Sequence, residues 1–181
     1  MTTQQRPAAQ TTEASSGTGK EKFLETYDRE HQTTMRVLRA YPRDKLDLKP
    51  HAMCKSAREL AWVFVAERMF GTVAFNDQLA TGQMPPMGQE PPESWDAILD
   101  EAERAHREFG EMVRRTPEDQ LRRTVKFFVG PKTMGDVSRM DLLWSFLHDE
   151  IHHRGQFSIY LRMAGGKVPS IYGPTADEPW M

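Results

Sequence analysis

A histidine-rich run near the C-terminal end of the sequence contains the residue types that bind divalent metal ions. Residues 147–156 read LHDEIHHRGQ. Residues four apart lie one turn apart on the same side of an α-helix, and two such pairs occur here, His148 with His152 and Asp149 with His153. Either spacing suits two ligands on one ion, because imidazole nitrogens and carboxylate oxygens bind a divalent metal at about 2 Å.

The position of each pair around the helix predicts which one faces inward. At about 100° per residue, both pairs lie on apolar arcs, and the arc of His148 and His152 is nearer the middle of the expected buried sector. The charged side of this helix, which we expect to face away from the core, holds Arg139, Glu150 and Arg154. Both pairs stay open as ligands, as does an interpretation in which these histidines only hydrogen-bond to carboxylates in the core.

A third ligand must come from another helix, and Glu67 is the best candidate. It lies in the middle of an apolar stripe, between Phe64 and Gly71, where it could be a metal ligand or a general base. His31 and His106 also fall on or beside apolar stripes, and we interpret both as core histidines.

A second metal chemistry is suggested by two Glu-x-x-His motifs, the ligand motif of di-iron carboxylate bundles. They are Glu103 with His106, and Glu150 with His153. The pattern disfavours a di-iron site, because Glu103 lies off the apolar stripe of its helix and Glu150 lies on the charged side. The only cysteine, Cys54, has no histidine directly beside it in the sequence, which favours an inert thiol.

Four amphipathic helices are predicted to position these residues. Their expected ranges are 20–40, 56–82, 94–116 and 138–164. Ser56 with Glu59 forms a Ser-x-x-Glu capping box, Ser94 and Ser138 are further N-caps, and residues 165–166 (Gly-Gly) end the last helix. Residues 124–129 predict an extended strip or a short hairpin. The fold class is therefore all-α, a four-helix bundle with a long connection between helices 3 and 4.

Composition sets the remaining expectations. The chain has 181 residues and a net charge of −2, with 24 Lys and Arg against 26 Asp and Glu. This balance predicts no nucleic-acid partner, the single cysteine indicates a reducing cytoplasm, and no apolar run approaches the roughly 20 residues of a membrane span. Residues 1–19 contain no aromatic residue, Leu, Ile or Val and are predicted to be a disordered tail. Residues 20–181 form one domain, onto which the apolar residues of the 167–181 tail pack back.

The last helix resembles that of the DinB/YfiT-like family. The resemblance is carried by residues 152–162 (HHRGQFSIYLR), with support from 165–169 (GGKVP), 172–174 (YGP) and 56–62 (SARELAW), and it covers about residues 20–181. It implies a four-helix bundle, a homodimer, and a divalent metal held between helices by three histidines. Two of these come from a His-x3-His motif whose second His directly precedes Arg-Gly-Gln, and one comes from the second helix.

The sequence departs from that pattern at two positions. The residue before Arg-Gly-Gln is His153, so its partner position holds Asp149, and the expected second-helix histidine falls at about Trp62. The resemblance therefore implies a variant site made of Glu67 and either helix-four pair, holding Zn, Ni or Fe. The implied activity is that of a metal-dependent hydrolase or a thiol S-transferase acting on a small molecule. The alternative is a metal-free, non-catalytic binding or interaction bundle.

Overall fold

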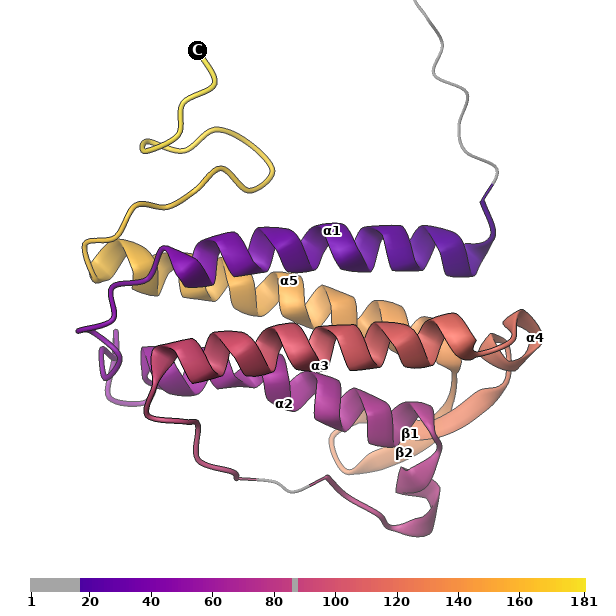
Figure 1. The fold of residues 1–181 in the computed structure, drawn as a ribbon. Coiled ribbons are helices and arrows are strands. Elements are labelled where there is room, and N and C mark those ends of the chain that lie inside the picture. Colours follow the sequence, from indigo (N-terminus) through magenta and orange to yellow (C-terminus); the bar gives the residue numbers. More distant parts are fainter. Residues whose placement is uncertain (1–16, 86–87) are drawn as a thin grey trace, which may run out of the picture.

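Four long helices make up most of the described chain, which spans residues 17–85 and 88–181 of this computed structural model. The helices are α1 (Gly19–Arg39), α2 (Ala57–Phe75), α3 (Trp95–Arg115) and α5 (Arg139–Met163) (Figure 1). The shorter elements are the 3-10 helix η1 (Gln78–Thr81), the one-turn helix α4 (Glu118–Leu121), and the strands β1 (Thr124–Gly130) and β2 (Thr133–Ser138). The prediction of an all-α bundle with four helices is confirmed.

The ends of the helices follow the predicted capping residues. The Ser56 hydroxyl accepts a hydrogen bond from the Glu59 N–H at 3.2 Å, and the Glu59 carboxylate accepts one from the Ser56 N–H at 2.5 Å. Ser94 and Ser138 cap α3 and α5 in the same way through their hydroxyls. Gly165 has a φ of +81°, the left-handed conformation with which many helices end.

The start of α1 is set by a capping box of Thr18 and Glu21, whereas the sequence prediction placed Thr18 in the disordered tail. The Thr18 hydroxyl accepts from the Glu21 N–H, and the Glu21 carboxylate accepts from the Thr18 N–H at 2.8 Å. Residues 1–16 of the predicted tail lie outside the described residues.

The prediction that the second helix continues to about residues 81–82 is wrong. The helix α2 ends at Phe75, and Asp77 takes a left-handed conformation with a φ of +57° before η1 begins. The Asp77 carboxylate accepts a hydrogen bond from the Lys126 N–H of β1 at 2.7 Å. A tertiary contact therefore accompanies the break in the helix, and sequence periodicity does not report such contacts.

Each long helix packs against two others, so that the bundle is square in cross-section. The helices α1 and α2 each contact both α3 and α5. The helices α1 and α5 run in one direction and α2 and α3 in the other (Figure 1). The diagonal corners are therefore held by α1 and α2, and by α3 and α5, whereas the consecutive helices α2 and α3 are neighbours. Because α3 and α5 are diagonal, the connection between them must be long.

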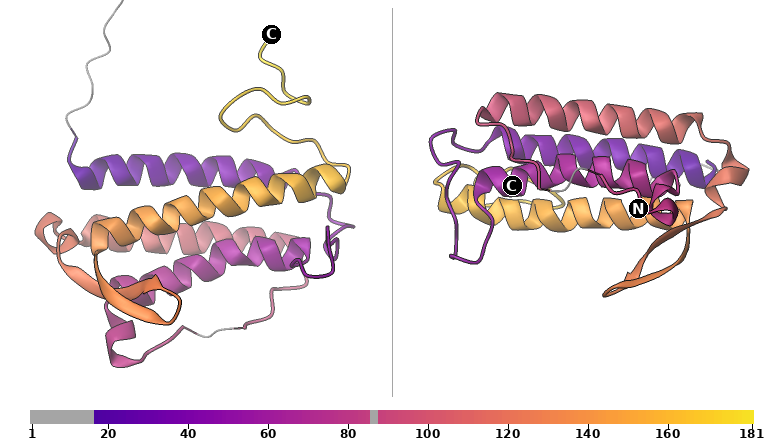
Figure 2. Two further views of the ribbon diagram at one scale, coloured as in Figure 1. Left: turned by 180° about the vertical axis from the view of Figure 1, so that it is seen from behind. Right: turned by 90° about the horizontal axis from the view of Figure 1, so that it is seen from below.

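That connection forms a hairpin that projects from the side of the bundle (Figure 2). Strands β1 and β2 pair antiparallel, with an irregularity between Phe128 and Gly130. The ring of Phe127 packs near Phe70 of α2 and Phe146 of α5, with centroid distances of 5.8 and 5.6 Å. The predicted short hairpin is confirmed.

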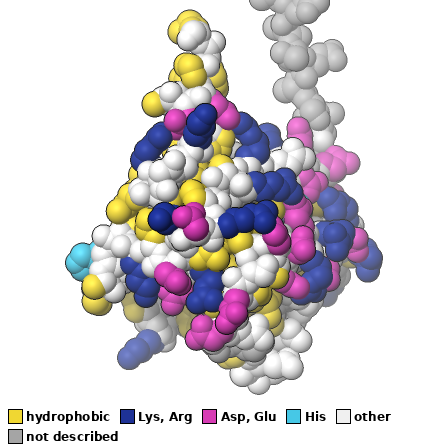
Figure 3. Space-filling model, turned by 60° about the vertical axis from the view of Figure 1, so that its left-hand side comes forward, with side chains coloured by type: hydrophobic (Ala, Val, Ile, Leu, Met, Phe, Trp, Pro, Cys, Tyr) yellow, Lys and Arg dark blue, Asp and Glu magenta, His cyan; other side chains and the backbone are white. Residues whose placement is uncertain are grey.

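The C-terminal tail runs back over the end of the bundle where α1 and α5 finish. Val168 and Ile171 pack against the core, whereas the side chains of Tyr172 and Trp180 stay mostly exposed. Acidic and basic side chains are interspersed over the face shown in Figure 3. Among the described helices, none is long and apolar enough to cross a membrane.

The rotation of α5 differs from the predicted one. Its buried line is Leu143, Leu147, Glu150, Arg154, Phe157 and Leu161, whereas His148 and His152 are exposed. The expectation that Glu150 and Arg154 face away from the core is therefore wrong. Both side chains are completely buried because each forms an ion pair inside the bundle, Glu150 with Arg68 and Arg154 with Glu30.

Candidate metal centre

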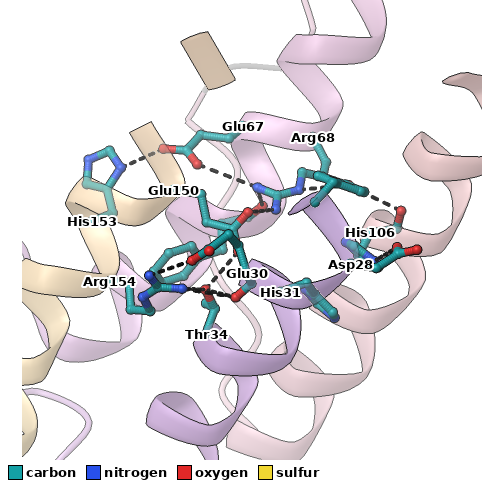
Figure 4. A network of polar contacts seen from close by, with 12 residues as sticks. Asp28, Glu30, His31, Thr34, Glu67, Arg68, His106, Glu150, His153 and Arg154 are labelled. Atoms are coloured by element: carbon teal, nitrogen blue, oxygen red, sulfur yellow. Dashed lines mark hydrogen bonds and ion pairs between the residues drawn. The ribbon is translucent and has the colours of Figure 1, made fainter. Parts of the chain in front are cut away.

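Three of the five candidate ligands lie together between α2 and α5. One donor atom each of Glu67, Asp149 and His153 lies within 4.8 Å of the others. The Glu67 Oε1 atom is 2.6 Å from His153 Nδ1, and Asp149 Oδ1 is 3.7 Å from the same nitrogen. Figure 4 shows the Glu67 carboxylate and the His153 ring pointing toward one another across the gap between the helices.

Helix geometry accounts for this convergence. Asp149 and His153 are four residues apart and therefore lie on one side of α5. Glu67 lies on the edge of the buried face of α2 that borders α5, between the core and solvent. His153 is only partly buried and Asp149 is half exposed, so the group is closed on the bundle side and open on the other.

The buried carboxylate of Glu67 lacks hydrogen-bond partners. Its side chain is 8% exposed, yet neither oxygen accepts a hydrogen bond within the described structure, and His153 Nδ1 also lacks a hydrogen-bond partner although it lies 2.6 Å from Glu67 Oε1. The nearest cation, Arg68 Nη1, is 3.7 Å from Glu67 Oε2. A buried charged group that makes ion-pair contacts but no hydrogen bond is costly, and a divalent ion in this gap would supply the missing partner. The residues present therefore fit a metal ion.

The charge states of this group are set by burial and by the close contact. Burial raises the pKa of the Glu67 carboxyl, and the nearby His153 and Arg68 partly offset this effect. The Glu67 carboxylate in turn raises the pKa of His153, against the effect of burial. Burial thus favours the neutral form of Glu67, whereas the contact with Glu67 favours the protonated form of His153.

A shallow depression of about 410 Å³ lies next to the group. It is lined by Phe127, Ser145, Phe146, His148, Asp149 and His152. His148 and His152 belong to this rim and not to the converging donors, and His152 Nε2 lies 2.8 Å from the Gln156 amide. The structure thus favours the Asp149 and His153 register over the His148 and His152 register.

The remaining core histidines form a separate cluster between α1 and α3. The rings of His31 and His106 stack at 3.7 Å with an interplanar angle of 6°. His31 Nε2 lies 3.1 Å from Glu103, and His106 Nε2 lies 3.0 Å from Asp28. Because Glu103 pairs here and Glu150 pairs with Arg68, the two Glu-x-x-His motifs do not converge, which argues against a di-iron centre.

The environment of this cluster keeps its rings neutral. Burial, the stacked His31 and the cations Arg68 and Arg114 lower the pKa of His106 to about 2. Burial also lowers the pKa of His31, against the effect of the bonded Glu103. His106 Nδ1 is buried without a hydrogen-bond partner, so a proton placed there would find no acceptor.

Sequence reasoning missed four buried charged residues, and the buried threonine bonded to them, beneath the candidate metal centre. These are Glu30 and Thr34 of α1, Arg68 of α2, and Glu150 and Arg154 of α5 (Figure 4). The signal that could have found them is spacing, since Glu150 and Arg154 continue the line of Leu143 and Leu147 at steps of three and four. Cys54 lies half-buried before α2 and is not among the converging donors.

Comparison with known proteins identifies relatives along almost the whole chain. The family model described as "DinB family" matches residues 10–180. The Bacillus subtilis protein YrdA is 27% identical over 156 residues, covering 86% of this chain and 89% of YrdA.

Solved structures show the same fold. A DinB-like protein from Bacillus cereus superposes with a TM-score of 0.67 at 21% identity, covering 84% of this chain and 97% of that protein. YfiT from Bacillus subtilis, described as "a probable metal-dependent hydrolase with an unusual four-helix bundle topology", superposes with a TM-score of 0.62 at 13% identity, covering 88% of this chain and 95% of YfiT. The square bundle, the resemblance in the last helix and the family model agree, and the chain belongs to the DinB family.

Proposed function

We propose that this protein is a metal-dependent hydrolase whose divalent ion is held by Glu67, Asp149 and His153. The observation that carries the proposal is the buried Glu67 carboxylate, which lacks hydrogen-bond partners and faces two further donors. The description of the structurally similar YfiT as a probable metal-dependent hydrolase supports it. Zn, Ni and Fe all accept imidazole and carboxylate ligands.

The arrangement suits hydrolysis because the donors occupy only one side of the site. A divalent ion with an open position supplies a Lewis acid that polarises a scissile group and lowers the pKa of a bound water. Glu67 is held on the inner side, and the half-exposed Asp149 borders the depression where a substrate would lie. His148 and His152 stand on the same rim, where an imidazole can give a proton to a leaving group. Thiol S-transfer at the same centre is the alternative reaction.

The test is the metal content and metal affinity of the purified protein. We expect one ion of Zn, Ni or Fe per chain by elemental analysis. Glu67→Gln and His153→Gln should each weaken the binding of Zn²⁺, titrated by calorimetry, by more than about 100-fold, because even loss of a partner of a metal ligand costs roughly 10–100-fold.

Neighbouring histidines provide matched controls for this experiment. His148→Gln and His152→Gln change the same residue type on the exposed side of α5 and should leave the affinity for Zn²⁺ close to that of the wild type. Folded wild-type protein that neither contains nor binds metal would contradict the proposal and favour the metal-free interaction bundle. If His152→Gln loses Zn²⁺ binding and His153→Gln does not, the ligands on α5 are His148 and His152 instead of Asp149 and His153.

We also propose that the protein is a homodimer and that the hairpin carries the contact. Phe127 packs the hairpin on the bundle, but Phe128, Val129 and Met134 are still 44%, 57% and 42% exposed, which leaves apolar side chains for a second copy to cover. Light scattering should give twice the 20.8-kDa chain mass. Phe128→Ser combined with Val129→Ser should give the monomer mass, while the distant exposed Met53→Ser should not. A wild-type monomer at high concentration would overturn this.

A further inference from the structure

Each donor of the candidate metal centre is followed in the sequence by a buried charged residue. The three pairs are Glu67-Arg68, Asp149-Glu150 and His153-Arg154. Consecutive residues of a helix point about 100° apart, so each pair places one side chain at the edge of the bundle and the next inside it. Contacts that hold the buried residues Arg68, Glu150 and Arg154 therefore also fix the direction of the metal donors that precede them.

The first ion pair joins the two helices that supply the donors. Arg68 of α2 binds Glu150 of α5 through its Nη2 atom, and both side chains are almost completely buried. The Thr34 hydroxyl donates to Glu150 Oε1 at 2.7 Å, and Arg68 Nε donates to the Tyr27 hydroxyl at 3.2 Å. Because Thr34 and Tyr27 belong to α1, this ion pair also ties both donor helices to a third.

The second ion pair joins α5 to α1 and to the C-terminal tail. Arg154 Nη1 donates to the Glu30 carbonyl at 3.0 Å, and Nη2 donates to Glu30 Oε2 at 2.8 Å (Figure 4). Although its side chain is mostly exposed, Tyr172 donates from its hydroxyl to Glu30 Oε2 at 2.6 Å. Arg154 lies over the Tyr172 ring and also donates to its hydroxyl. Through Tyr172, the tail therefore contacts both members of the second ion pair.

We propose that these two ion pairs are positioning groups for the metal centre and that Tyr172 completes them. The inference rests on the proposed metal site. A guanidinium fixes its partners through several directional, charge-assisted bonds, so turning α5 to move Asp149 and His153 away from Glu67 would break both pairs. Apolar side chains of similar size would fill the same space without specifying that rotation.

Replacing both members of an ion pair with apolar residues distinguishes a role in positioning the metal donors from a role in stabilising the fold. Replacing a buried ion pair with apolar residues is often neutral or stabilising, so Glu30→Met combined with Arg154→Met should fold with an unfolding midpoint near that of the wild type. Its affinity for Zn²⁺, measured by calorimetry, should nevertheless fall by about 10–100-fold. The increase in melting temperature caused by Zn²⁺ should shrink in the same variant. A purely structural role would instead shift the metal-free and metal-loaded proteins equally.

The tail provides a milder variant and its control. Tyr172→Phe removes the hydroxyl and keeps the ring over Arg154, and we expect about a threefold to tenfold loss of Zn²⁺ affinity. Glu178→Gln weakens an exposed contact of the same tail with Arg36 and should leave the affinity unchanged.

Failure of this inference can be distinguished from failure of the proposed function. If the wild type binds Zn²⁺ and both the double variant and Tyr172→Phe bind it equally well, the positioning role is wrong and the metal site stands. If wild-type protein binds no metal, both proposals fall. If Glu178→Gln and Tyr172→Phe lose the same amount of Zn²⁺ affinity, the cause is a weaker contact of the whole tail with the bundle. That result would overturn the specific role of Tyr172.

Discussion

Replacing Arg68 with methionine should lower the free energy of unfolding by about 3–5 kcal/mol, the typical cost of breaking a buried ion pair from one side. The Arg68 and Glu150 side chains are 6% and 1% exposed. Without the guanidinium, the Glu150 carboxylate keeps only the Thr34 hydroxyl as a partner in the core, and the Tyr27 hydroxyl loses its Arg68 donor. The loss is expected to be large because a buried charge remains uncompensated.

Urea unfolding followed by circular dichroism measures the loss of stability in Arg68→Met. Two further variants show whether the unpaired charge causes it. Arg68→Met combined with Glu150→Met should recover most of the stability, because no charge then remains unpaired. Arg104→Met removes an arginine of α3 whose pairs with Glu101 and Glu108 are exposed, and should cost no more than about 1 kcal/mol. A similar cost for Arg68→Met and Arg104→Met would show that the buried pair does not stabilise the core.

The sequence predicted the helices well because their signals are local. The caps at Ser56, Ser94 and Ser138 and the stop at Gly165 all lie within a few residues of the backbone groups that they satisfy. The end of α2 was mispredicted because it coincides with a contact between Asp77 and β1, more than forty residues further along the chain. A break accompanied by such a contact leaves little trace in the local pattern of apolar residues.

The rotation of α5 could not be derived from the pattern of apolar residues. That pattern treats Glu150 and Arg154 as surface residues, whereas their partners on α1 and α2 allow them to be buried. Spacing along α5 proposed two ligand pairs, and only the tertiary structure distinguishes them by bringing Asp149 and His153 to Glu67. The choice of Glu67 was made from its place in an apolar stripe, where a carboxylate requires a partner.

Acidification should destabilise the contact between α1 and α3 through its two stacked histidines. The pKa of His106 and that of His31 are both lowered in the folded protein, chiefly by burial. The charged groups that face these rings are Asp28 and Arg39 of α1, Arg68 of α2, Glu103 and Arg114 of α3, and Glu150 of α5. Each imidazole already lies beside the other, so two protonated rings would repel at 3.7 Å.

The direction of this pH dependence follows from whether the folded or the unfolded protein binds a proton at the higher pH. An unfolded histidine titrates near pH 6.5, whereas folded His106 resists protonation until far lower pH. Below about pH 6.5 the unfolded state therefore binds more protons, and His106 alone should lower the free energy of unfolding by up to about 1.4 kcal/mol per pH unit. This contribution to stability is fully present above pH 6.5 and is lost progressively as the pH falls toward the folded pKa.

The measurement compares urea unfolding of the wild type and of His106→Phe between pH 8 and pH 4.5. Phenylalanine keeps an aromatic ring against Tyr27 and His31, and Asp28 keeps its pair with Arg114. The difference at pH 8 gives the cost of the substitution itself. Below pH 6.5 the free energy of unfolding should fall less steeply in the variant than in the wild type, with a difference of about 1 kcal/mol for each pH unit. Parallel pH profiles for the two proteins would contradict the prediction and show that His106 takes up its proton in the folded bundle as readily as in the unfolded chain.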